Sequence, residues 1–139
     1  QQSRYIEAVT WSENENIAPQ KRMFRTPDHY GYFMATYEPI RKFTINLNGK
    51  LTGPMLIQHY AGYVAEDEEV LSPVFFDMGI KFAYEIPLYR LYSLEINAGV
   101  KNIFDSFQRD IDKGIDRDAG YIYGPSLPRT YFFGLNFKL

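Results

Sequence analysis

Apolar and polar side chains alternate with a period of two along four segments of the chain, which is its strongest regular pattern. In a strand this period puts successive side chains on opposite faces. The apolar sets are Phe43, Ile45, Leu47 and Leu51; Phe76, Met78, Ile80, Phe82 and Tyr84; Leu94, Ile96, Ala98 and Val100; and Tyr131, Phe133, Leu135, Phe137 and Leu139. The pattern therefore predicts four strands, each with one apolar and one polar face.

Two further segments, Ser3–Trp11 and His29–Tyr37, carry a weaker alternation. The apolar set predicted for the second of them is Tyr30, Tyr32 and Met34. In total the sequence predicts six antiparallel strands and no helix of substance.

The predicted connections alternate between short and long. Glu38–Lys42 and Ile86–Leu91 are short, and each contains a proline, which cannot continue a sheet ladder. Ser12–Asp28, Pro54–Val74 and Asp105–Pro128 are long, polar and interrupted by glycine and proline. Antiparallel strands with tight turns at one end and long loops at the other are typical of outer-membrane barrels, whose tight turns lie in the periplasm.

Composition agrees with half-apolar strands, because 17% of residues are aromatic while the mean hydropathy is only -0.34. No apolar run approaches the roughly 18 to 20 residues of a membrane-spanning helix, so membrane contact would require a barrel or a surface.

A net charge of -2 with dispersed basic residues argues against a nucleic-acid partner. With no cysteine, disulfides and thiolate metal sites are excluded. An export signal is expected elsewhere or already removed.

Two interpretations of the alternating strands remain open. In a soluble sandwich or ligand-binding barrel the apolar face is a core, whereas in a transmembrane barrel it meets lipid. Polar faces with small residues and isolated charges favour the membrane, as do the tyrosines Tyr37, Tyr84, Tyr89 and Tyr92 near the predicted turns. Six strands cannot close a transmembrane barrel, so their outer edges would pair with the rest of a larger one.

Specific residues resemble those of TonB-dependent outer-membrane receptors. Val100–Asp105 resembles the Asn-Leu-Phe-Asp element that closes the penultimate strand of that family. Tyr121–Pro125 and Pro128–Leu135 resemble its final strand, where Pro-Arg-Thr and an aromatic residue lead into a terminal amphipathic strand. Arg25–Pro27 and Leu51–Gly53 are weaker similarities.

The resemblance implies that residues 1–139 form the C-terminal part of an outer-membrane β-barrel of about 22 strands, without the plug domain and energy-coupling box. The family usually ends in Phe, whereas this chain ends in Leu139. The implied location is the outer membrane of a Gram-negative bacterium, and the outer loops are similar to those of Bacteroidetes members.

The implied function is active import of a scarce large ligand of the ferric siderophore, haem or cobalamin class, driven by TonB-coupled energy. Implied partners are the remainder of the barrel and its plug, the TonB complex acting through the plug, the lipid bilayer and, where one closes the barrel mouth, a surface lipoprotein. No enzymatic activity and no cofactor is expected. A soluble ligand-binding β-barrel or sandwich, and an outer-membrane barrel enzyme, are the alternatives.

Candidate ligand-facing residues lie in the third long loop: Arg109, Asp110, Asp112, Asp116, Arg117, Asp118, Tyr121 and Tyr123. Oxygen ligands suit hard cations, but the loop lacks the Gly and Glu positions of a calcium loop. Interleaved arginines and Lys113 favour a loop that neutralises its own charge, and no metal site is predicted.

The polar face of the alternating strands would line the barrel lumen. The residues predicted to face the lumen are Asp77, Lys81, Glu85, Glu95, Asn97 and Lys101. Folding the chain about Leu88 would put Lys81 directly opposite Glu95.

The acidic run Glu66–Glu69 in the second long loop could hold Ca²⁺ or repel anions, although a solvated loop tip is the commoner state of such a run. His29 and His59 have no ligand spacing, which favours ordinary loop positions for both. The chain has no Gly-x-Ser-x-Gly, no phosphate-binding glycine loop and no His-Glu-x-x-His.

Overall fold

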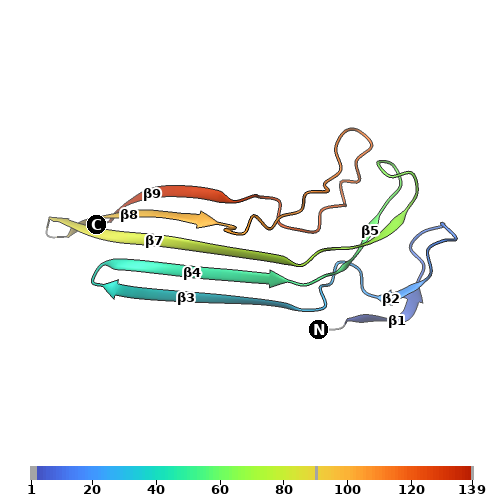
Figure 1. The fold of residues 1–139 in the computed structure, drawn as a ribbon, viewed down its shortest axis with the longest axis horizontal. Coiled ribbons are helices and arrows are strands. Elements are labelled where there is room, and N and C mark those ends of the chain that lie inside the picture. Colours follow the sequence, from blue (N-terminus) through green and yellow to red (C-terminus); the bar gives the residue numbers. More distant parts are fainter. Residues whose placement is uncertain (1–2, 90, 139) are drawn as a thin grey trace. The chain divides into compact units, whose positions relative to one another are not determined.

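The computed structural model describes residues 3–89 and 91–138, and this part of the chain folds into strands without helices (Figure 1). The strands are β1 (Arg4–Val9), β2 (Gln20–Arg22), β3 (Tyr30–Ile40), β4 (Phe43–Thr52), β5 (Leu56–His59), β6 (Glu68–Leu71), β7 (Phe75–Tyr89), β8 (Tyr92–Lys101) and β9 (Thr130–Lys138). The predicted all-β class with antiparallel sheets is confirmed.

Three sheets are formed: β1 with β2, β5 with β6, and a five-stranded sheet in the order β3-β4-β7-β8-β9. Within the described residues the five-stranded sheet is open at β3 and β9 and does not close on itself. No helix in this part of the chain has the length and apolar character needed to cross a membrane.

The chain forms two compact units. The loop unit consists of residues 1–30, 52–75 and 108–126 and contains β1, β2, β5 and β6. The sheet unit consists of residues 31–51, 76–107 and 127–139 and contains nearly all of the five-stranded sheet.

All six predicted strands are present, with two differences. The first pairs with β2 in its own small sheet and is not part of the five-stranded sheet. The long connections also contain β2, β5 and β6, which the sequence pattern missed because strands of three or four residues are too short to display a period.

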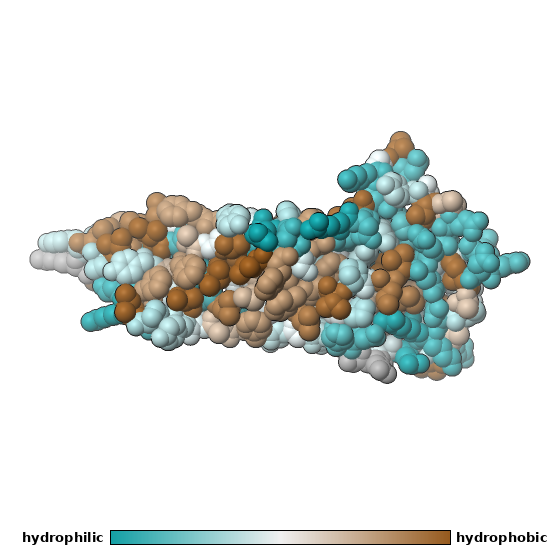
Figure 2. Space-filling model, in the orientation of Figure 1, coloured by the Kyte–Doolittle hydropathy of each residue, from teal (hydrophilic) through white to brown (hydrophobic). Residues whose placement is uncertain are grey.

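Cross-strand partners in β7, β8 and β9 form rows that alternate between the two faces of the sheet. The apolar rows are Ile80, Val100 and Tyr131; Phe82, Ala98 and Phe133; Tyr84, Ile96 and Leu135; and Ile86, Leu94 and Phe137. The rows between them are Lys81, Gly99 and Phe132; Ala83, Asn97 and Gly134; and Glu85, Glu95 and Asn136. The predicted parity of these three strands, meaning which alternate residues lie on the apolar face and which on the polar face, is therefore confirmed. Figure 2 shows apolar side chains gathered over these strands.

The predicted parity of β3 is wrong. A Cβ on Gly49 would lie 2.2 Å from the ring of Phe33, so Phe33 shares the apolar face of β4 and fills the gap that Gly49 leaves there. Thr36 Oγ1 donates a hydrogen bond to Asn46 Oδ1 (2.9 Å), which puts the even positions of β3, including Tyr32 and Met34, on the polar face. Packing against a glycine in the next strand decided the parity, and the sequence of β3 alone does not contain that information.

The two short connections begin later than predicted, because both prolines lie inside strands. Pro39 belongs to β3, an edge strand of its sheet. Pro87 pairs with Ser93 beside a register irregularity that separates it from Tyr89. An edge and an irregularity are the positions where a strand accepts a residue without an N–H donor.

Lys81 is opposite Gly99, and Glu95 is opposite Glu85, so the predicted direct pair of Lys81 with Glu95 is wrong by four residues along β8. Both side chains still lie on the polar face, and Lys81 Nζ is 3.6 Å from Glu95 Oε1. Lys138 Nζ completes the group, 2.7 Å from Glu95 Oε2 and 3.2 Å from Glu85 Oε2. The shift in register is even, and an even shift preserves the face of every side chain.

Side chain to backbone hydrogen bonds connect the end of β8 to the start of β9. The buried Asn102, whose φ is 49°, donates from Nδ2 to the carbonyls of Leu127 (3.0 Å) and Ser106 (3.3 Å) and accepts from the Ser106 amide (2.8 Å). Asp105 Oδ1 accepts from the Arg129 amide (2.9 Å). These contacts tie the residues that follow β8 to those that precede β9.

The two units differ in what they bury. The buried hydrophobic residues of the described chain are Met55, Ile57, Phe75 and Tyr121, and all lie in the loop unit. Exposed large hydrophobic residues on the apolar face of the sheet unit are Phe33, Tyr37, Phe82, Tyr84, Tyr131, Phe133, Leu135 and Phe137. Nothing in the described part of the sheet unit covers this face.

Candidate functional site

The loop unit has a small core that places a histidine among apolar side chains. Met55, Ile57 and Tyr121 form this core, with Val70 packed against it. The buried positions 55, 57 and 59 alternate along β5, so His59 points to the same side as Ile57. His59 pairs across the hairpin with Glu68 of β6.

His59 is 4% exposed and lies between two carboxylates. Its Nε2 is 2.9 Å from Oδ2 of Asp112, which is itself 5% exposed and also accepts the Asp118 amide (3.0 Å). Its Nδ1 is 3.3 Å from Glu68 Oε1 but makes no hydrogen bond of acceptable geometry. The imidazole also stacks on the ring of Tyr121, with centroids 3.6 Å apart and planes within 9°.

Two tyrosines converge on one carboxylate oxygen beside the histidine. Tyr121 Oη and Tyr123 Oη both donate to Asp110 Oδ2, at 3.1 Å and 2.5 Å. Gln108, which is buried, positions this segment: Nε2 donates to the Tyr121 carbonyl (3.0 Å), and Oε1 accepts from the amides of Tyr123 (2.8 Å) and Gly124 (3.2 Å). The segment is therefore fixed by polar contacts.

These contacts shift the pKa values of the groups involved. Burial, with the Asp110 carboxylate adding to it, raises the pKa of the Tyr121 phenol to about 12. The pKa of Tyr123 is raised by the same two causes. Burial opposes ionisation of Asp110, but hydrogen bonds from Tyr123 and Tyr121 outweigh it and hold the pKa of that carboxyl below its usual value. Both phenols therefore remain protonated donors to an ionised Asp110 at neutral pH.

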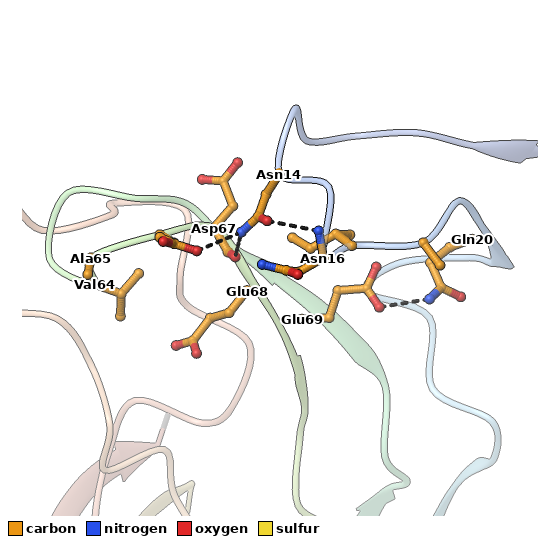
Figure 3. Close-up of a pocket in the computed structure, with 11 residues that line it drawn as sticks. Asn14, Asn16, Gln20, Val64, Ala65, Asp67, Glu68 and Glu69 are labelled. Carbon is orange, nitrogen blue, oxygen red and sulfur yellow. Dashed lines mark hydrogen bonds between the residues drawn. The ribbon is translucent and has the colours of Figure 1, made fainter.

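A pocket of about 680 Å³ lies beside the acidic run, and Figure 3 shows the residues around it. Its lining residues are Asn14, Asn16, Ile17, Ala18, Gln20, Val64, Ala65, Glu66, Asp67, Glu68 and Glu69. Four consecutive carboxylates thus face a space large enough for a small molecule.

Neutral donors hold three of these carboxylates. Glu66 accepts from Asn14 Nδ2 (3.1 Å), and Glu69 accepts from Trp11 Nε1 (2.9 Å) and Gln20 Nε2 (2.8 Å). Hydrogen bonds from the Ser12 hydroxyl and the Ala61 amide lower the pKa of Asp67. Because these donors carry no charge, the negative charge of the run is not cancelled by them.

The predicted ligand-facing residues divide into two groups. Asp112 and Tyr121 are buried and contact His59, Asp118 and Tyr123 are half-buried beside them, and the exposed Asp110 accepts from both tyrosines. Arg109, Asp116 and Arg117 are exposed. The carboxylate of Asp112 lies against the imidazole of His59, with Oδ2 2.9 Å from Nε2.

The predicted lumen set shares the polar face of the sheet unit. Lys81, Glu85, Glu95 and Asn97 lie in the polar rows, and Asp77 has the same parity in β7. Lys101 Nζ lies 5.6 Å from the ring centroid of Phe132.

The ordinary loop position predicted for His59 is wrong, because His59 is buried in β5, and its contact with Glu68 was not predicted. The available signal was the period-two set Met55, Ile57 and His59, which marks His59 as a buried position of a short strand. Its partners could not be recognised, because Asp112 lies 53 residues further along the chain.

Among the described residues, no group of three or more His, Cys, Asp or Glu side chains is arranged around a common metal position. No protein family, curated protein or solved structure matches the chain. The strands and their order in the described residues define the class: an all-β protein with an open antiparallel sheet and a loop unit.

Proposed function

We propose that this chain is the C-terminal barrel portion of a TonB-dependent outer-membrane transporter, which imports a scarce ligand of the metal-chelate or cobalamin class. The observation that carries the proposal is the uncovered apolar face of the five-stranded sheet. A soluble sheet buries its apolar face in a core, whereas here the large side chains of that face are exposed, including Tyr131 and Phe133 of β9.

The opposite face supports the proposal by its chemistry. Along β7, β8 and β9 it holds, apart from Phe132, glycines, an asparagine and the ion pairs of Lys81 and Lys138 with glutamates, as expected of a wall that encloses water. The open edges at β3 and β9 require neighbouring strands, because unpaired backbone groups are costly in lipid.

The loop unit would be the ligand-capturing part. It carries the pocket beside Glu66–Glu69 and the polar cluster around His59, whereas the sheet unit supplies the wall. The TonB complex would act through a plug held inside the complete barrel. The protein's location would be the outer membrane.

Nitroxide labels on single introduced cysteines test the membrane assignment, which is practical because residues 1–139 contain no cysteine. We expect labels that replace apolar-face residues to respond to lipid-soluble quenchers. The positions are Phe76, Ile80, Phe82, Ile96, Phe133 and Phe137. Matched labels at Ala83 and Asn136, on the other face, should respond to aqueous quenchers only.

Access from water alone at most apolar-face positions would contradict the membrane assignment and favour the soluble alternative. Transport is tested separately, by uptake of labelled ferric siderophore, haem or cobalamin into cells with and without a functional energy-coupling complex. Uptake that does not depend on that complex would contradict the transporter assignment.

A further inference from the structure

We propose that His59 and Glu68 form a binding site for a divalent transition metal of the zinc type, with coordination positions left open for a second ligand. A role of this site in uptake rests on the proposed function. If that function holds, the site narrows the imported ligand to a chelate of a Zn²⁺-like metal ion. The binding itself is a property of the loop unit.

The contacts of His59 determine which of its two ring nitrogens carries the hydrogen in the neutral imidazole. Asp112 Oδ2 is an acceptor, since it also receives the Asp118 amide, so the imidazole must donate to it from Nε2. In a neutral ring Nδ1 then carries a lone pair and no hydrogen. A carboxylate on the far nitrogen is the arrangement that orients histidine ligands in metal sites.

The free nitrogen faces the acidic run. Nδ1 is buried, has no hydrogen-bond partner and lies 3.3 Å from Glu68 Oε1. A lone pair and a carboxylate oxygen repel each other unless a cation lies between them. Two ligands bound at about 2.0–2.1 Å to a tetrahedral metal stand roughly 3.3–3.4 Å apart, so the observed separation suits a shared ion.

The neighbouring groups keep this geometry in place. Stacking on Tyr121 restricts rotation of the imidazole, and the β5–β6 pairing keeps His59 opposite Glu68.

The pocket reaches the Glu68 side of the site, since Glu68 lines it and His59 does not, and it adds negative charge there. Glu68 is half exposed and lines the pocket together with Glu66, Asp67 and Glu69. Hydrogen bonds from neutral donors hold these three, so they contribute negative charge near the ion without being required as ligands. With two protein ligands, the remaining positions belong to water or to a chelating molecule seated in the pocket. Imidazole with carboxylate favours Zn²⁺, Co²⁺, Ni²⁺ or Cu²⁺ over Ca²⁺ and Mg²⁺.

Calorimetric titration of the whole purified protein with Zn²⁺ tests the site, and Co²⁺ reports coordination through its visible spectrum. We expect Glu68→Gln to weaken Zn²⁺ binding by a factor on the order of ten or more. Glu66→Gln is the matched control. It removes the same charge from the same run and pocket, at a carboxylate that contacts Asn14 and not His59. It should change the affinity by less than about twofold.

Equal losses in the two variants would reveal diffuse attraction to the acidic run and overturn the proposal. So would Ca²⁺ binding as tightly as Zn²⁺, because the imidazole would then play no part. If no metal binds and nitrogen NMR finds both imidazole nitrogens protonated, a proton fills the gap and the site is not a metal site. Specific Zn²⁺ binding together with water-only access at the labelled strands would keep the site and reject the transporter.

Discussion

Two buried amide side chains of this protein each bond several backbone groups. Gln108 satisfies a carbonyl and two amides, and Asn102 satisfies two carbonyls and one amide. His59 differs, because its Nδ1 is buried without a hydrogen-bond partner, as is the Nε of Arg22. A buried polar atom without a partner costs about 1–3 kcal/mol, which is why it indicates a missing ion or proton.

Asn102→Ala should destabilise the sheet unit by about 2–4 kcal/mol. The change leaves the Leu127 carbonyl and the Ser106 amide without their donor and acceptor, and it puts alanine at a positive φ that asparagine tolerates better. Urea unfolding of the whole protein measures the loss. Asn136→Ala, at an exposed position of β9, is the control and should cost less than about 1 kcal/mol. Similar losses at both positions would contradict the role of Asn102.

Tyr121 should ionise later than an ordinary tyrosine when the pH is raised. Its folded pKa of about 12 lies above the value of about 10 in an unfolded chain, so its stabilising contribution is complete below about pH 10 and is lost as the pH rises toward 12. Ultraviolet titration of phenolate absorbance in the wild type and in Tyr121→Phe isolates this group. Asp110→Asn should lower the pKa of Tyr121, because it removes the charge that opposes phenolate formation. An unchanged pKa in that variant would show that Asp110 has no influence on the phenol.

At the scale of elements, glycines on the polar face allow larger side chains to lie across neighbouring strands. The ring of Phe132 occupies the space over Gly99, and the amide of Asn97 occupies the space over Gly134. Large and small residues therefore complement each other from β8 to β9, which fixes the register of the pair.

Gly99→Ala tests this complementarity. A Cβ at Gly99 would lie 2.3 Å from the Ile80 carbonyl oxygen and 2.5 Å from the Phe132 ring, so backbone and ring must both move. We expect a loss of about 1–3 kcal/mol in the free energy of unfolding. Gly31→Ala in β3 is the matched control, because a Cβ there meets nothing within 4 Å. An equal effect at both sites would point to backbone entropy and not to packing.

At the scale of the whole molecule, the proposed barrel assigns opposite sides of the membrane to the two ends of the strands. Gly114 lies in the loop unit at a positive φ with open space around it, and Leu91 belongs to the connection between β7 and β8. An epitope inserted after Gly114 should bind antibody on intact cells. One inserted before Leu91 should bind only after the outer membrane is opened. The reverse labelling would invert the topology, and labelling of neither site on permeabilised cells would point to loss of the protein.

The sequence by itself determined where the six longer strands lie and, for β7, β8 and β9, which residues share a face, because a period of two is a local property of an extended chain. It also determined which residue types populate each face. Both follow from neighbours one or two positions apart.

Only the tertiary structure decided register, the parity of β3 and the environment of His59. The β7–β8 turn comes later than its proline indicates, Phe33 turns toward a glycine of the next strand, and His59 meets an aspartate 53 residues away. Each outcome depends on the shape or charge of a group on another segment. Such contacts exist only after the segments have come together, so no periodicity along the chain contains them.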